Sequence, residues 1–524
     1  MLRGLQPAGS RVRDPVAVRR VIEIPLLTSV LLVSRVVFRS HYLYDLDSVN
    51  FALALRRFDP GVHQPHPPGY FLYIWLGRVV NLVFHDANTA FVLISIVASA
   101  GALIMIWVLA NSWFGRRPAL FAGLNFVFSP LIWFHGTVAL TYAVEMFFSA
   151  LTGYLCWRVY REGRLAVAAA ATAGLAAGFR PSFLLFVAPL LLFSLLFSPA
   201  RGRWIRLLAA TVAISVTVCL WFFPMVWQSG GFEAYFSALL SLWRTVPGRQ
   251  TGANSTVANS IARLFSIAAI YVLCFGVAAL LSFRRAPESM LDRSKRSFVL
   301  VWILPGLGFF TLVFLKFVNS GYLLVIAPPV FAWLGLKEAD WYQRLRTMRL
   351  PRIAIVGVCV VANSLMFLFA PVYSSWSSVH RFEGELETVV RTIPTIASAA
   401  DTMIVGFDSH FLGYRHAGYY LPGWFTVQYP EVRLASGIRV FAMEGADTHL
   451  ADTLPLDRYR NFLLFPLPAG DTEYADYMVR IRDRLPPDSI RTIRAGGREY
   501  TFGKVSDLPL LFPAAAKLAA ENVR

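Results

Sequence analysis

Two carboxylates, Asp45 and Asp47, follow the first long apolar stretch of the chain, in the sequence YLYDLDSVNFALALRRFDP. A third, Asp59, lies in the same polar segment. Carboxylates grouped beside an apolar stretch are suited to general base catalysis. Asp47 also precedes apolar residues at helical spacing, so it would cap a helix over about residues 48–57. Capping and catalysis are compatible, and we expect Asp47 to have a catalytic role.

The run HQPHPPGY, residues 63–70, sets His66 before two prolines and a glycine. Proline fixes the backbone angle φ and glycine is tolerant of unusual angles, so this composition predicts a rigid turn. His66 is a candidate ligand or proton carrier, because its charge changes near neutral pH. The alternative is that His66 is an ordinary turn residue.

Glu145, in HGTVALTYAVEMFF, lies near the outer end of a predicted membrane span. A carboxylate without a partner is costly there, so such a residue is usually functional or paired. Glu145 is therefore a candidate for the acceptor site or, together with Asp47, for a metal site. The alternative is an ion pair between Glu145 and a neighbouring arginine.

Two cations are predicted at the outer headgroup level. Arg180 lies in a very short turn, and Lys316 lies at the outer end of another span. Fixed cations at this depth would neutralise the charge that develops on a lipid phosphate, and Tyr322 would add a hydroxyl to the same site. The alternative for both cations is snorkelling or binding of ordinary phospholipid. Arg35 is a weaker candidate of the same kind.

The composition shows whether most of the chain is surrounded by water or by lipid. Of 524 residues, 56% are hydrophobic and 15% are charged, whereas soluble domains carry about 25% charged residues. The chain is therefore predicted to be a polytopic membrane protein. Its formal charge of +18 comes from short arginine clusters between apolar runs, as the positive-inside rule predicts, which argues against nucleic-acid binding. The four cysteines show no paired or metal-ligand spacing.

Apolar runs of membrane-spanning length predict about eleven transmembrane helices. Their ranges are 21–38, 89–110, 119–136, 138–158, 165–179, 182–198, 207–227, 265–283, 298–315, 321–336 and 353–373. Residues 70–84 are apolar but short and carry Arg78 and Asn81. If this segment lies flat in the interface, all basic clusters fall on the cytoplasmic side. We therefore predict a cytoplasmic N-terminus and one external loop over residues 39–88 with two interfacial helices.

The last 150 residues differ from the rest of the chain. Short apolar runs such as TMIVGF, RNFLLFPL and REYTFGKV alternate with helical or turn-rich stretches. This pattern predicts a soluble α/β domain over residues 374–524, outside the membrane, beyond a transmembrane module over residues 1–373. Within it, Asp408, His410, Arg415 and His416 are either acceptor contacts or an ordinary polar face.

The DLD triplet also matches the DxD pattern of enzymes that use sugar nucleotides, but three residues carry little specificity. An external site fits a lipid-phosphate donor better, because nucleotide sugars are cytoplasmic. Several motifs resemble the GT-C membrane glycosyltransferases, including protein O-mannosyltransferases of family 39, aminoarabinose transferases of lipid A and the HPPGYPLY-signature group. They are Asp47 with Phe51-Ala52, HPPGYFLY, FGRRPAL, GLAAGFRPSFLLFVAPL and KFVNSGYLLVIAPPV.

The resemblance implies a hexosyl- or pentosyltransferase of the cell envelope, in the plasma (inner) membrane. It would move a sugar from a polyprenyl-phosphate donor to a lipid, glycan or protein acceptor by inverting displacement. The resemblance implies that Asp47 is the base, with Asp45 as the second candidate. No cofactor is required, although a divalent metal is possible. Asp47 is followed by Ser48 instead of the Glu of several family members, which weakens the case for a two-carboxylate metal site. The alternatives are a lipid or sugar transporter or flippase, and a noncatalytic scaffold.

Overall fold

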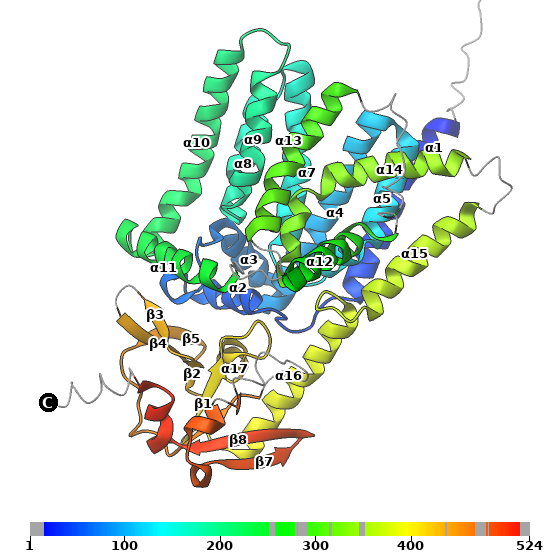
Figure 1. Ribbon diagram of the computed structural model, residues 1–524. Helices are drawn as coiled ribbons and strands as arrows, with labels where there is room; N and C mark the ends of the chain where they lie inside the picture. The colour runs from blue at the N-terminus through cyan, green and yellow to red at the C-terminus, as the bar shows by residue number, and fades with distance from the viewer. Residues whose placement is uncertain are drawn as a thin grey trace, which may run out of the picture.

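The computed structural model describes residues 15–250, 257–277, 280, 292–313, 317–344, 352–434, 437–466, 478–479 and 481–513. A bundle of helices makes up most of the chain, and a sheet with two helices lies at one end of it (Figure 1). The predicted combination of a mainly helical membrane part and a C-terminal α/β part is confirmed by this architecture.

Nine of the predicted spans are single helices. Their apolar runs carry few charges, as a helix in a lipid environment requires, and four of the nine contain an interior proline without breaking there. They are α1 (Pro15–Val37), α4 (Ala87–Phe114), α7 (Tyr142–Glu162), α8 (Ala166–Phe179), α9 (Phe183–Leu196), α10 (Arg203–Gln228), α12 (Val257–Phe275), α13 (Arg293–Val313) and α15 (Arg352–Phe369). The span predicted to reach residue 283 ends earlier, at Phe275.

The other two predicted spans are broken, each at proline. Residues 119–136 divide into α5 (Arg116–Phe128) and α6 (Pro130–His135), with Ser129 extended between them. Proline disfavours a helical conformation in the preceding residue, and the Ser129 hydroxyl accepts the N–H of Ile132 to start the new helix. Residues 321–336 divide into a 3-10 helix, η4 (Phe317–Val325), and α14 (Ala327–Arg344), bent by 74°. Two prolines in the first turn of α14 lack the N–H groups that would continue the preceding helix.

Among the described residues, three helices are long and apolar enough to cross a membrane on their own: Ala87–Phe114, Arg203–Gln228 and Arg293–Leu312. The bent pair of η4 and α14 would make a fourth if it counts as one span. These helices place the protein in the membrane.

The loop after α1 contains α2 (Leu46–Arg56), a short 3-10 helix η1 (Pro60–Val62) and α3 (Phe71–Phe84). Both helices match the predicted interfacial segments. They lie at the end of the bundle that faces the C-terminal sheet (Figure 1). The segment between the predicted spans 207–227 and 265–283 contains α11 (Phe232–Gln250), whose Tyr235 hydroxyl donates to the Pro68 carbonyl at 3.1 Å. This hydrogen bond ties the first loop, at Pro68, to α11.

The C-terminal part begins with α16 (Trp376–Ile396) and holds a mixed eight-stranded sheet in the order β3-β4-β2-β1-β6-β8-β7, with β5 paired to β4. The central strand β1 is buried along its whole length and is parallel to both neighbours, as expected for a sheet covered on both faces. The strands are β1 (Thr402–Phe407), β2 (Thr426–Tyr429), β3 (Val432–Leu434), β4 (Gly437–Glu444), β5 (Asp447–Ala451), β6 (Asn461–Leu464), β7 (Arg491–Ala495) and β8 (Arg498–Lys504); the short helices are α17 (Tyr414–Tyr420), η6 (Pro487–Ser489) and η7 (Val505–Leu510).

Candidate active site

Asp45 and Asp47 stand at the start of α2, but in different environments. Asp45, not Asp47, is the N-cap: its Oδ1 accepts the backbone N–H of Asp47 at 2.9 Å. The expectation that Asp47 caps the helix is therefore wrong by two residues, because the chain is already helical at Leu46. Asp45 is buried, and burial, together with the nearby Asp47 carboxylate, raises its pKa to about 6. Because Asp45 makes the cap, the Asp47 side chain is not needed for it, and at 38% exposure it is accessible to a substrate.

The turn that carries His66 is closed by backbone bonds at its base. Asp59 and Gln64 form a bridge, in which Gln64 N donates to Asp59 O at 2.9 Å. The Gly69 N–H donates to the His66 carbonyl, and Gly69 has φ of 114°, a conformation that favours glycine. The Gly69 position thus explains why the prolines are followed by glycine before α3 begins.

His66 joins the two ends of this loop. Its Nδ1 lies 3.2 Å from Oδ1 of Asp47, and its Nε2 lies 2.9 Å from the Tyr70 hydroxyl. Burial lowers the pKa of His66 and raises the pKa of Tyr70, so the imidazole is neutral and the phenol is protonated at pH 7. A neutral imidazole carries one proton, and the Asp47 carboxylate beside Nδ1 favours the tautomer with that proton on Nδ1. In this tautomer the Tyr70 hydroxyl donates to Nε2.

Arg180 ends α8, in the turn where the sequence predicts it. Its Nε lies 3.2 Å from Oε2 of Glu145, in the first turn of α7, and its Nη1 donates to the Thr141 hydroxyl at 2.6 Å. The guanidinium carbon is 4.3 Å from the ring centre of Tyr142 and 4.4 Å from that of Tyr322. Such close ring faces stabilise a buried cation. Of the two interpretations of Glu145, this geometry matches the ion pair with an arginine.

The Asp47 group and the Arg180 group form one cluster. The Tyr70 ring, whose hydroxyl meets His66, lies 5.8 Å from the Arg180 guanidinium carbon. On the other side of Arg180, the rings of Tyr142 and Tyr322 lie against each other with their centres 5.6 Å apart. The cluster therefore holds six of the predicted site residues, which come from the first loop, α7, the end of α8 and η4: Asp45, Asp47, His66, Glu145, Arg180 and Tyr322. Lys316 lies outside the described residues.

Sequence reasoning missed two members of the cluster, Tyr70 and Tyr142. Tyr70 belongs to the HPPGY motif and follows His66 by four residues, a spacing that was a usable signal. Tyr142 contacts Arg180 across a large sequence separation, so its role was not visible locally. His135 borders the cluster with its ring centre 4.9 Å from that of Tyr142.

The C-terminal part closes over the first loop. Leu46 N donates to the His410 carbonyl, and His416 Nε2 lies 3.2 Å from the Leu43 carbonyl. Arg415, 1% exposed, donates to the Val62 carbonyl at 2.8 Å. Of the polar residues predicted in this region as acceptor contacts or polar face, Arg415 and His416 are thus buried against the first loop.

A metal site was a further possibility, with Asp47 and Glu145 as ligands. Within the part of the chain that the structure describes, no three His, Cys, Asp or Glu side chains gather into a metal-binding group. Glu145 faces Arg180, and Asp47 faces His66.

Comparisons with known proteins agree with this fold. Residues 65–227 match the family model for dolichyl-phosphate-mannose-protein mannosyltransferase. The crystal structure of apo ArnT from Cupriavidus metallidurans is similar at 13% identity and a TM-score of 0.59, covering 94% of this chain and 98% of that chain. The same protein bound to undecaprenyl phosphate gives 13% identity and a TM-score of 0.57, with 93% and 98% covered. No curated protein matches the chain.

The chain resembles the GT-C type membrane glycosyltransferases, and the resemblance expected from the motifs is confirmed. The particular solved fold that it shares over nearly its whole length is that of ArnT.

Proposed function

We propose that this protein is a glycosyltransferase that moves a sugar from a polyprenyl-phosphate donor to an acceptor at the outer face of the membrane. The observation that carries the proposal is the cluster in which a half-exposed carboxylate, Asp47, and a buried cation, Arg180, meet through His66 and Tyr70. A relative of the same fold, ArnT, has been solved with undecaprenyl phosphate. The acceptor is a lipid, a glycan or a protein, and the sugar is a hexose or a pentose.

In the proposed reaction, Asp47 takes the proton of an acceptor hydroxyl or amine, and the acceptor atom forms a bond to the anomeric carbon. The bond from that carbon to the phosphate oxygen breaks, and its electron pair stays on the phosphate. The attack comes from the face opposite the phosphate, so the anomeric configuration inverts. Neutral His66 holds the Asp47 carboxylate through its Nδ1 side.

Arg180 neutralises the phosphate charge that develops as the sugar leaves, because a fixed cation in a water-poor site needs little reorganisation. Its partners Glu145 and Thr141 hold the guanidinium in place, and Tyr322 and Tyr142 cover its faces. Glu145 is thus proposed as a positioning residue. Lys316 is proposed, from its place in the sequence, as a second cation for the same phosphate.

We propose the membrane arrangement that the apolar runs and basic clusters of the sequence predict. Residues 1–373 form the transmembrane module of about eleven spans, with a cytoplasmic N-terminus. Residues 374–524 form an external, periplasmic or extracellular domain. The position of α2 and α3, between the bundle and the C-terminal sheet (Figure 1), supports a site at the outer membrane face.

The test is transfer activity in a deletion strain complemented with variants, with glycolipids and glycoproteins profiled by mass spectrometry. Asp47→Asn is expected to lower product by about 100-fold or more, the range of a lost general base. Asp86→Asn is the matched control, because Asp86 lies in the same loop and caps α4, a task that asparagine performs equally well. Undiminished product with Asp47→Asn would remove the base assignment. If the deletion strain lacks none of the glycolipids or glycoproteins of the wild type, the transporter or scaffold alternatives are favoured.

A further inference from the structure

The C-terminal part reaches the first loop through a buried arginine. Arg415, in α17, donates through Nη1 to the Thr448 hydroxyl at 2.7 Å and through Nη2 to the Val62 carbonyl at 2.8 Å. Its guanidinium carbon lies 5.6 Å from the ring centre of Phe441. Burial of a cation is costly unless its donors are satisfied. Loss of the hydrogen bond to the Val62 carbonyl would therefore leave a buried donor of Arg415 unsatisfied and destabilise this contact.

Val62 is coupled to the residues that precede His66. The Val62 N–H donates to the Asp59 carbonyl, and Asp59 in turn pairs with Gln64, whose neighbour is Pro65. A three-residue helix and a backbone bridge leave little room for Val62 to move independently of Gln64. A displacement of Val62 would therefore be passed to His66, two residues beyond Gln64.

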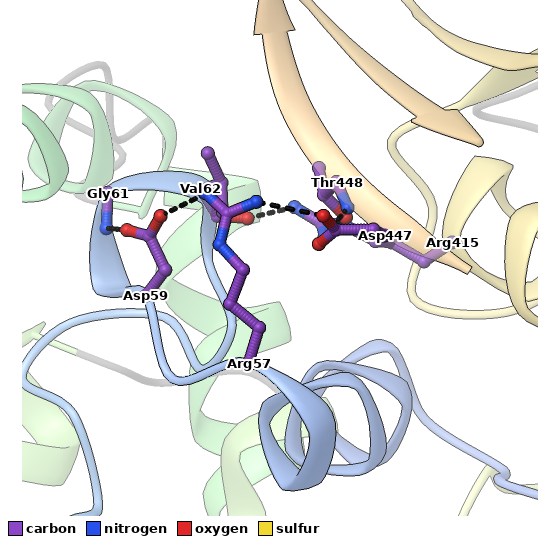
Figure 2. A network of polar contacts seen from close by, with 7 residues as sticks. All are labelled: Arg57, Asp59, Gly61, Val62, Arg415, Asp447 and Thr448. Atoms are coloured by element: carbon purple, nitrogen blue, oxygen red, sulfur yellow. Dashed lines mark hydrogen bonds and ion pairs between the residues drawn. The ribbon is translucent and has the colours of Figure 1, made fainter. Parts of the chain in front are cut away.

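A second contact joins the same two regions at the surface. Arg57 donates to Asp59 at 2.6 Å and to Asp447 of β5 at 2.9 Å, beside the Arg415 contact (Figure 2). The Arg57 and Asp447 side chains are 46% and 51% exposed. Exposed ion pairs contribute little, so this pair is a weaker tie than Arg415.

We infer that Arg415 is a positioning residue for the transfer reaction: the C-terminal domain uses it to hold the turn over residues 59–66, and thereby sets His66 against Asp47. The inference rests on the proposed function, in which Asp47 is the base. It gives the C-terminal domain a part in the chemistry, although none of its described side chains has been placed in the catalytic cluster.

The first measurement does not depend on activity. In the full chain in lipid nanodiscs, hydrogen exchange of peptides covering residues 58–70 is compared between wild type, Arg415→Met and Arg494→Met. Arg494 is the matched control, because it pairs with Glu499 on the exposed β7–β8 hairpin. Arg415→Met is expected to speed exchange in these peptides by about tenfold or more, the result of losing a buried backbone contact. Exchange equal to that of Arg494→Met would overturn the inference.

The second measurement is a double-mutant cycle with His66→Ala. If Arg415 acts through His66, Arg415→Met lowers kcat by about tenfold or more in the wild-type background, as expected for a displaced catalytic group, and by less than about twofold in the His66→Ala background. A merely structural arginine would lower kcat equally in both, which would overturn the inference. Arg415→Lys keeps the charge but cannot reach both acceptors at once, so its kcat is expected to lie between those of wild type and Arg415→Met. It replaces Arg415→Met in both measurements if that variant fails to fold.

The two measurements separate this inference from the proposed function. If wild type transfers no sugar while exchange responds to Arg415→Met, the function is wrong and the loop contact stands. If wild type is active and the cycle is additive, the function stands and the positioning role is wrong.

Discussion

The imidazole of His66 stands between Asp47 and Tyr70, with Nδ1 3.2 Å from the carboxylate and Nε2 2.9 Å from the phenol. One edge of the ring therefore faces the proposed base, and the other faces the tyrosine whose ring borders Arg180. This relationship links the two halves of the site, the half that activates the acceptor and the half that receives the leaving phosphate.

Tyr70→Phe tests this link. The change removes the hydroxyl that donates to His66 Nε2 but keeps the ring between Phe51 and Arg180. One neutral hydrogen bond is worth about 1 kcal/mol, so kcat is expected to fall by about five- to tenfold with almost no change in melting temperature. Steady-state kinetics and thermal unfolding check this expectation.

Tyr154→Phe is the control for Tyr70→Phe. Its hydroxyl hydrogen-bonds Arg158 in the same helix, and it belongs to no part of the site. An equal loss of kcat in both variants would show that the His66 contact has no special part in the reaction.

Asp45 gives a prediction about pH and stability. Its pKa is raised from an unfolded value near 3.8 to about 6, because burial and the neighbouring Asp47 disfavour the ionised form. The folded state therefore binds more protons between these two values, so this group makes stability fall as pH rises through that window. Asp45→Asn keeps a good N-cap without the charge. Its melting temperature is expected to vary less than that of wild type between pH 4 and pH 6.5.

The matched comparison for Asp45→Asn is Asp86→Asn, which also replaces an N-cap aspartate. That variant should keep the wild-type dependence of melting temperature on pH. If Asp45→Asn keeps it too, the buried carboxylate is not its source.

The ion pair of Arg180 and Glu145 predicts an asymmetry between single and double variants. Both side chains are buried, at 5% and 0% exposure, so removing one leaves the other without an opposite charge beside it. Glu145→Leu alone is expected to destabilise the fold by about 3–5 kcal/mol. Glu145→Leu with Arg180→Met is expected to recover most of the melting temperature while transfer stays abolished.

Recovered transfer in that double variant would contradict a role for Arg180 at the phosphate. A double variant as unstable as the single would instead show that the two charges do not compensate each other. Melting temperature in nanodiscs and product yield give the two readouts.

The proposed orientation predicts which engineered cysteines an impermeant thiol reagent reaches in intact cells. Thr492→Cys, on the exposed side of β7, should be labelled from outside, because the C-terminal domain is proposed to lie there. Arg117→Cys, exposed at the start of α5, should be labelled only after the membrane is permeabilised. The reverse pattern would invert the topology and move the site to the cytoplasmic face.

Local sequence was sufficient for much of the fold. Apolar runs located nearly all the helices, because a span is decided by the side chains within it. The breaks at Ser129 and before Ala327 were visible as prolines but were read as continuous spans. The error about the cap at Asp47 is also local. The helix α2 begins at Leu46, before the first residue that the apolar spacing predicted, so Asp45 is the N-cap instead of Asp47.

The sequence by itself determined that this is a membrane protein and which charged residues stood at the ends of its spans, because both depend on composition and on neighbours within a few residues. Only the tertiary structure decided their partners. Arg180 reaches Thr141 across 39 residues, and Arg415 reaches Val62 across 353. The physical reason is that a buried charge takes whatever partner packing brings to it, and no local pattern records that choice.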